Sequence, residues 1–247
     1  MDPQEVVFRV LLFKLFNSIP AWQILTTTLG PLTWKSFNAT TYGDILGKAK
    51  ARGVKIWNAA YMQKAQTGSN LIGKHNNYLN LLEGMMRSSI TERLLSPRTY
   101  EQAYRVLRTF PSPAMGDFTA MQLLTDINYS DVIDFDENDF IVPGPGCLRG
   151  IQKCFRRPVS VPEAQSIIYS LVDEQETYFE GLGFEPVTLF SRRLHAIDCQ
   201  NLFCETDKYA RVAHPEFKVK DGERIKHTFK PLGPLPAPFF PPKWKRN

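Results

Sequence analysis

The chain has 247 residues, of which 43% are hydrophobic and 22% charged, with a formal net charge of +5 at pH 7 and a sequence pI near 9.0. This balance excludes a disordered chain and predicts a globular protein with a sizeable buried core. The mild positive charge is compatible with a polyanionic partner, although a cytosolic enzyme can have the same balance.

Apolar residues recur with a helical period along most of the chain, and no alternation long enough for a β-sheet is present. The N-terminal run VVFRVLLFKLF is interrupted by Arg9 and Lys14, which favours a core helix over a membrane helix or a cleaved signal. We therefore expect an intracellular protein, in the nucleus if its source is eukaryotic and in the host cytoplasm if it is viral. The predicted helices cover residues 4–17, 21–30, 41–53, 56–65, 76–95, 96–110 and 161–183.

These patterns predict a mainly α fold with one helical domain over residues 1–230. The remaining tail, residues 231–247, is rich in proline and ends in basic residues, so it cannot be helical. We expect it to pack on the domain or to trail from it; a proline-rich ligand motif is the alternative.

The cysteines and histidines show no spacing typical of a metal site or a redox pair. We expect no metal and no cofactor, and we expect the cysteines to be free thiols in a reducing compartment. No motif for a serine nucleophile is present. The four cysteines are Cys147, Cys154, Cys199 and Cys204.

A turn rich in proline precedes Gly116 and joins two predicted helices. A helix that begins after such a turn offers backbone N–H groups to a phosphate. The segment resembles the hairpin of helix-hairpin-helix DNA glycosylases, with Gly116, Thr119 and Ala120 at matching places, although the first glycine of that pattern is missing. We expect Met115 and Gly116 to contact DNA phosphate; an ordinary helical corner is the alternative.

An acidic cluster, DFDEND, follows this first turn. In the glycosylase superfamily a catalytic aspartate lies at a characteristic distance after the hairpin, and here that distance leads to Asp136. Asp139 and the neighbouring acids leave the register open. Such an acid can activate a nucleophile or stabilise a cationic transition state. The alternative is a solvated acidic loop with a helix cap.

A second turn, VPGPGCLRGI, combines glycines and prolines before another helix. Gly144 and Gly146 allow a close approach, and the helix start adds free N–H groups and a positive dipole end. Arg149 and Lys153 add charges that pair with phosphate. We expect these four residues to bind DNA phosphate; a tight turn between helices is the alternative.

The segment HAIDCQNLFCETDKYARVAHPE, if helical, places one stripe of charged and amide groups on a single face. An Asn can contact a base edge, and an acid with a Lys can move protons, so this stripe suits a pocket wall. A salt-bridged surface face is the alternative. The stripe consists of Asp198, Asn201, Glu205 and Lys208.

Together these segments resemble one family, the helical domain found with 5-hydroxymethyluracil DNA kinases and the related alpha-glutamyl/putrescinyl-thymine pyrophosphorylases, itself related to helix-hairpin-helix DNA glycosylases. The resemblance covers nearly the whole chain except the tail, and its motifs are LFKLFN, MGDFTAMQLLTDINY, DFDENDFIVPGPGCLRGI, AIDCQNLFCETDKYAR and RIKHTF. It implies a helix-hairpin-helix glycosylase-like fold. It also implies action on a flipped, thymine-derived base in DNA, whose activated 5-methylene group is displaced by an amine or amino acid.

On this reading Asp136, Asp139 and Asp198 are the acid or base candidates, and Asn201, Glu205, Lys208 and Arg211 line the base pocket. Modified DNA is the expected partner, and a separate DNA-base kinase is a second candidate partner. Three other hypotheses stay open at this point. One is a monofunctional glycosylase, since Asp117 and Phe118 stand where a lyase lysine would be. Another is a non-catalytic module that binds modified DNA. The last is an unrelated helical scaffold, which binding to DNA without a steep loss on added salt would favour.

The segment GSNLIGKH, residues 68–75, nearly matches a phosphate-binding loop. His75 replaces the hydroxyl residue that would hold magnesium, and the preceding WNAAYMQKAQT is predicted to be helical rather than a strand. We therefore do not expect this chain to be a kinase itself.

Overall fold

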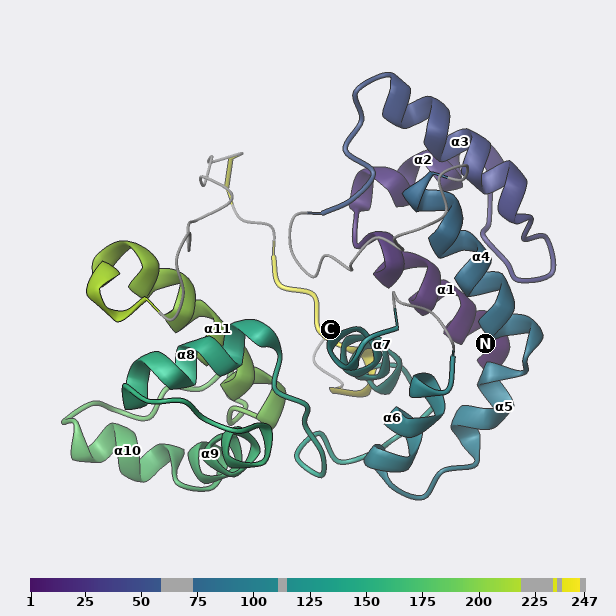
Figure 1. Ribbon diagram of the computed structural model, residues 1–247. Helices are drawn as coiled ribbons and strands as arrows, with labels where there is room; N and C mark the ends of the chain where they lie inside the picture. Colours follow the sequence, from purple (N-terminus) through teal and green to yellow (C-terminus); the bar gives the residue numbers. More distant parts are fainter. Residues whose placement is uncertain (59–72, 111–114, 219–232, 235–236, 245–247) are drawn as a thin grey trace. The chain divides into compact units, whose positions relative to one another are not determined.

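A computed structural model describes residues 1–58, 73–110, 115–218, 233–234 and 237–244. Within these ranges the chain is mainly helical and contains no named strand, which confirms the predicted fold class (Figure 1). The relation to helix-hairpin-helix glycosylases stays a prediction. The chain forms two compact units, whereas we expected one domain: Met1–Phe135 with Pro236–Asn247 is the first unit, and Asp136–Leu235 is the second.

The first unit is a helical assembly around α1. Its N-terminal helix packs against α4, α5 and α7, while α3 packs on α2 and α4, and α6 on α5 and α7. On α1, Phe8, Leu11 and Leu12 are buried, as the apolar run predicts. The helices are α1 (Pro3–Phe16), α2 (Ile19–Leu29), α3 (Ala39–Ala51), α4 (Lys74–Arg87), α5 (Ile90–Leu95), α6 (Tyr100–Arg108) and α7 (Asp117–Asn128).

Caps set the helix limits and correct three of the expected boundaries. The α3 helix begins after Asn38, whose side chain accepts a hydrogen bond from the backbone N–H of Thr41. Ser89 has a φ of 56° and separates α4 from α5, where one continuous helix was predicted. The α6 helix begins after Thr99 and not at Ser96, because the Thr99 hydroxyl accepts from the backbone N–H of Gln102.

One ion pair joins the first and last helices of this unit. Lys14 Nζ on α1 lies 2.8 Å from Asp126 Oδ1 on α7, and little of either side chain reaches solvent. The pair explains why a lysine can stand inside the apolar run of α1. In the part of the chain that the structure describes, no helix is long and apolar enough to cross a bilayer.

The end of the proline-rich tail that the structure describes, residues 237–244, packs on the first unit. The Trp244 ring meets the ring of Tyr129 edge-on at 5.5 Å between centroids. Lys243 Nζ lies 3.4 Å from Asp134 Oδ1. The packed terminus, one of the two outcomes expected for this tail, is therefore present at residues 237–244. Of the helix predicted over 56–65, residues 56–58 are not helical and the others lie outside the described ranges.

The second unit is organised around α8 and α11, two helices that pack against each other and run side by side in Figure 1. The predicted helix over 161–183 is present in two parts, because the chain turns at Glu174. The segment HAIDCQ onward is helical, as the stripe of polar groups required. The helices are α8 (Pro145–Phe155), α9 (Val161–Asp173), α10 (Gln175–Gly181) and α11 (Ala196–Ala213).

Two glycines of α8 let the backbone of α11 approach very closely. A Cβ built on Gly150 would lie 1.9 Å from the carbonyl oxygen of Phe203, and one on Gly146 would lie 2.5 Å from Cys204 Sγ. The Phe203 carbonyl belongs to backbone and cannot move aside, so position 150 excludes every side chain. Close packing of the two helices thus accounts for a glycine at positions 146 and 150.

We expect Gly150→Ala to destabilise the protein by at least about 1–3 kcal/mol, because the helices must separate to admit a methyl group. The matched control is Gly84→Ala in the last turn of α4, where a Cβ meets nothing within 4 Å. That change is expected to stabilise by about 0.5–1 kcal/mol, because alanine has the higher helix propensity. Urea unfolding measures both, and equal effects of the two substitutions would contradict the packing argument.

Candidate active site

The acidic loop after the first unit leads directly to the start of α11. Asp136 Oδ1 accepts a hydrogen bond from the backbone N–H of Asn138, at 2.8 Å, and so fixes a tight turn. Asn138 Oδ1 in turn accepts from the backbone N–H of Ala196, the first residue of α11, at 2.9 Å. Two motifs that are far apart in the sequence, DFDEND and HAIDCQ, therefore meet at one helix N-terminus.

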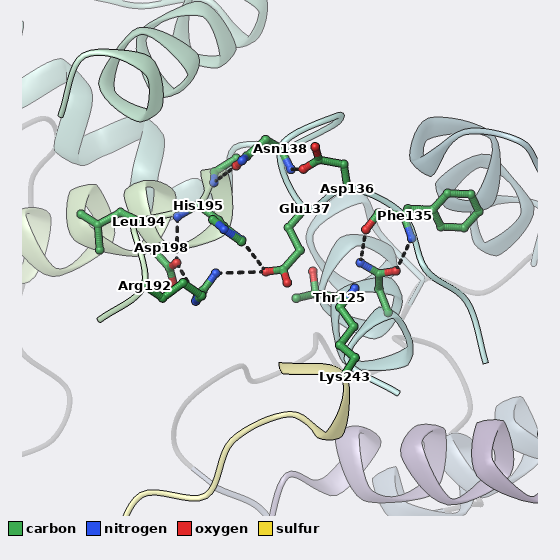
Figure 2. A network of polar contacts seen from close by, with 12 residues as sticks. Thr125, Phe135, Asp136, Glu137, Asn138, Arg192, Leu194, His195, Asp198 and Lys243 are labelled. Atoms are coloured by element: carbon green, nitrogen blue, oxygen red, sulfur yellow. Dashed lines mark hydrogen bonds and ion pairs between the residues drawn. The ribbon is translucent and has the colours of Figure 1, made fainter. Parts of the chain in front are cut away.

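Glu137 is the buried acid of this loop, and it points at His195 and Arg192 (Figure 2). Its Oε2 lies 3.0 Å from His195 Nδ1 and 3.5 Å from Arg192 Nη1. The side chain of Glu137 is 7% exposed and that of His195 is 24% exposed. The carboxylate is thus withdrawn from water, while part of the imidazole remains accessible.

Asp198 completes this group from the first turn of α11. Its Oδ2 accepts from the backbone N–H of His195 at 2.9 Å and lies 2.9 Å from Arg192 Nη2. A carboxylate at this position satisfies a free N–H group and interacts favourably with the positive end of the helix. Asp198 therefore positions His195 and Arg192, and its geometry is that of a helix cap.

The position of Glu137 bears on which nitrogen of His195 carries the proton, since Oε2 lies 3.0 Å from Nδ1. A carboxylate that faces Nδ1 favours a proton on Nδ1, so the neutral ring has a lone pair on Nε2. Such a carboxylate–imidazole pair is the usual means of holding an imidazole ready to accept a proton from a nucleophile. Arg192 lies between the two carboxylates, with Nη1 3.5 Å from Glu137 Oε2 and Nη2 2.9 Å from Asp198 Oδ2.

Sequence reasoning chose the neighbours of the buried acid. Asp136 and Asp139 are exposed, and Asp136 orders the loop through its hydrogen bond to Asn138. Among the acids of DFDEND, Glu137 is the one whose side chain is buried. Neither His195 nor Arg192 was selected, because no local pattern marks them; only the prediction that the acidic loop and Asp198 act together pointed to this place.

Buried on α11 is Asp207, which binds three basic side chains. Lys153 Nζ lies 2.9 Å from Oδ1, Arg149 Nη2 lies 3.1 Å from Oδ2, and Arg211 is also hydrogen-bonded to Oδ2. Lys153 is almost fully buried. These three cations are paired with an internal carboxylate that sequence reasoning missed; phosphate binding by Arg149 and Lys153, and a place for Arg211 in a base pocket, stay predictions.

The second turn also has partners inside the protein. The backbone N–H of Gly144 donates to Gln200 Oε1 at 2.8 Å. Phosphate contact by Gly144 and Gly146 stays a prediction. Gly146 faces Cys204 of α11. The turn joins two packed helices, and its glycines and N–H groups serve that packing.

The first turn lies partly outside the described residues, at 111–114. Met115 is buried, and its carbonyl oxygen accepts a hydrogen bond from Arg108. Gly116 is exposed and caps α7, and the next residue, Asp117, is held by Arg108 Nε at 2.8 Å and by Tyr104 OH at 2.7 Å. A carboxylate thus already occupies the first turn of this helix. DNA contact by Met115 and Gly116 stays a prediction.

The predicted pocket wall on α11 is not gathered into one site. Glu205 and Lys208 are exposed and form an ion pair with each other, one turn apart. Asn201 is partly buried, two turns before Lys208. The described structure fits the alternative for Glu205 and Lys208, a salt-bridged surface face.

The four cysteines are free, as predicted, and Cys147 and Cys199 are buried. Burial raises the pKa of Cys147 and of Cys199 to about 12, so these thiols stay protonated at neutral pH and do not serve as nucleophiles. Among the described residues, no group of three His, Cys, Asp or Glu side chains is arranged to hold a metal ion.

Two sequence motifs remain outside the described ranges. Most of GSNLIGKH lies at 68–72, most of the preceding WNAAYMQKAQT lies at 59–67, and RIKHTF lies at 224–229. Of the first motif, Gly73, Lys74 and His75 are described, and α4 begins at Lys74.

Residues 1–219 match the family described as the helical domain of 5-hmdU DNA kinases. The chain therefore belongs to this family, as its motifs indicated. No curated protein and no solved structure matches the chain. Membership of the family indicates an enzymatic role in the hypermodification of thymine in DNA, with DNA as substrate.

The buried charge of Asp207 leads to a test of stability against pH. Burial alone would raise the pKa of this carboxyl, but hydrogen bonds from Arg211 and Lys153 and the charge of Arg149 outweigh burial, so the pKa lies below its usual value. A lowered folded pKa stabilises the protein above the unfolded value of about 3.9, and this stabilisation is lost as the pH falls through the folded value.

We therefore expect Asp207→Asn to lower the free energy of unfolding by about 3–5 kcal/mol at neutral pH, because it leaves buried cations without their partner. The difference from the unchanged protein should shrink below about pH 4, where the unfolded carboxyl is protonated. Urea unfolding at several pH values measures this. Glu176→Gln, which removes an exposed carboxylate of the same unit, is the control and should show a small effect. A difference that does not vary with pH would contradict the assignment.

Proposed function

We propose that this protein modifies a 5-substituted thymine base in DNA by displacing an activated group on the 5-methylene carbon with an amine or amino acid. The observation that carries the proposal is the pair formed by Glu137 Oε2 and His195 Nδ1 at 3.0 Å. Membership of the 5-hmdU DNA kinase helical-domain family supports the choice of substrate.

The proposed displacement requires a general base on the protein, because the amine itself is the nucleophile. An amine attacks only in its neutral form, so a proton has to leave the nitrogen as the new C–N bond forms. His195 Nε2 accepts that proton, while Glu137 holds Nδ1 and stabilises the resulting imidazolium. The C–O bond to the activated group breaks, and the leaving group departs with the electron pair.

The substrate base has to leave the stack before this chemistry. A duplex base is reached only by extrusion, which costs a few kcal/mol and is repaid by contacts with the flipped nucleotide. Arg192, held between Glu137 and Asp198, adds a positive charge beside the imidazole that favours an anionic leaving group. The proposal assigns the proton transfer to His195 and Glu137 in place of Asp136 and Asp139, which are exposed.

The proposal is tested on oligonucleotides that carry thymine, 5-hydroxymethyluracil or its phosphorylated form, incubated with the protein and a pool of amines and amino acids. Mass spectrometry of the digested nucleosides detects the product. A gain in base mass is expected. A free base with an abasic site would instead identify a glycosylase, and salt-sensitive binding with unchanged nucleosides would identify a non-catalytic DNA-binding module.

For Glu137→Gln we expect the rate of product formation to fall by about 100-fold or more, because a general base contributes about 10²–10⁴-fold. The KM for the oligonucleotide should stay unchanged, since Glu137 acts on the imidazole and not on the DNA. Glu176→Gln, an exposed Glu paired with Arg193, is the matched control and should keep full activity. A parallel loss of activity and thermal stability in Glu137→Gln would show a structural role only.

A further inference from the structure

A basic cavity of about 390 Å³ lies at the C-terminal end of α8, away from the His195 network along α11. Four cationic side chains line it: Lys153, Arg156, Arg157 and Lys218. Phe217 forms part of its wall, and the guanidinium of Arg156 lies 4.5 Å from the centre of that ring. No acidic side chain is among its described lining residues.

The charges around this cavity do not cancel. Asp207 compensates Lys153 but is shared with Arg149 and Arg211, Glu163 pairs with Arg157, and Glu216 lies within electrostatic reach of Arg156. Lys218 adds a fourth positive charge. Arg156 ends α8 in a left-handed backbone conformation, φ 54° and ψ 34°, and its guanidinium lies 4.5 Å from the centre of the Phe217 ring. A cationic wall of this kind suits a phosphate group.

Next to the basic cavity is an aromatic cavity of about 570 Å³. Its walls include Phe155, Tyr178 and Phe203, and the first two side chains are about half exposed. Arg157 connects the two cavities: it lines the basic one, it is paired with Glu163 of the aromatic one, and its guanidinium lies 5.9 Å from the ring of Phe155.

We propose that these two cavities bind single-stranded DNA, with a backbone phosphate in the basic cavity and an unpaired base against Phe155 and Tyr178 in the aromatic cavity. A cationic groove beside solvent-accessible rings is the arrangement by which proteins hold single strands, since the charges follow the backbone and every base has a face that can stack. The choice of DNA as the nucleic acid rests on the proposed function. The geometry of the two cavities supports a phosphate site and a base-stacking site.

Fluorescence anisotropy of the full chain with a labelled oligothymidine of about 15 nucleotides, a length that spans a typical single-strand site, tests this inference. For the double variant Arg156→Gln/Lys218→Gln we expect binding about tenfold weaker. The slope of log K against log salt should fall in magnitude by about 1.4, the value for two lost phosphate contacts on a single strand. Arg87→Gln/Arg105→Gln is the control, because it removes the same charge from two exposed ion pairs of the first unit.

The base contact is tested separately by Phe155→Leu, which keeps an apolar side chain but removes the ring. We expect single-strand binding to weaken by about 5- to 100-fold, the range for one lost stacking contact. Binding of the matching duplex should change little. Phe184→Leu, at an exposed phenylalanine of the same unit outside the cavity lining, is the control. Circular dichroism and thermal melting check that each variant is folded.

Three results would overturn the inference: equal weakening in the two double variants, equal binding by Phe155→Leu and Phe184→Leu, or a duplex that binds as tightly as the single strand. Because unmodified oligothymidine is used, this test does not depend on catalysis. Normal binding through the cavities with no modified product would contradict the proposed function alone. Product formation with normal binding by these variants would contradict only the binding site.

Discussion

The second unit depends on the direct backbone contact between α8 and α11. Gly150 permits it, since the Phe203 carbonyl oxygen occupies the space that any side chain would need. Beside this contact Asp207 is fully buried, and a buried carboxylate needs positively charged side chains within ion-pair distance. Arg149 and Lys153 therefore point inward to Asp207. One constraint thus explains both the glycines and the cations of the second turn.

The same frame fixes two separate chemical environments. At the start of α11, Asn138 of the acidic loop accepts a hydrogen bond from the backbone N–H of Ala196. This contact places Glu137 beside His195. At the end of α8, the chain turns at Arg156 and presents a cationic wall beside exposed rings. Proton transfer and strand binding are therefore assigned to different ends of one helix pair, so each can be altered without the other.

The sequence predicts well what depends on local periodicity. The helices, the buried face of α1 and the absence of a long apolar span follow from patterns within one segment. Burial and long-range pairing do not, and the site depends on them. A basic residue near a glycine turn looks the same whether it binds DNA or, like Lys153, a carboxylate 54 positions later. Likewise, Glu137 differs from Asp136 and Asp139 only in the direction in which the folded loop turns its side chain.

The most direct test of this account is the tautomer of the His195 ring, observed by long-range ¹H–¹⁵N correlation in the full chain at a pH where the ring is neutral. His195→Asn identifies the signal by its loss. The account predicts a proton on Nδ1, facing Glu137, and a lone pair on Nε2, with this preference lost in Glu137→Gln. A ring in the unchanged protein with its proton on Nε2 would contradict the account, because His195 could then not take a proton from a nucleophile while Glu137 holds it.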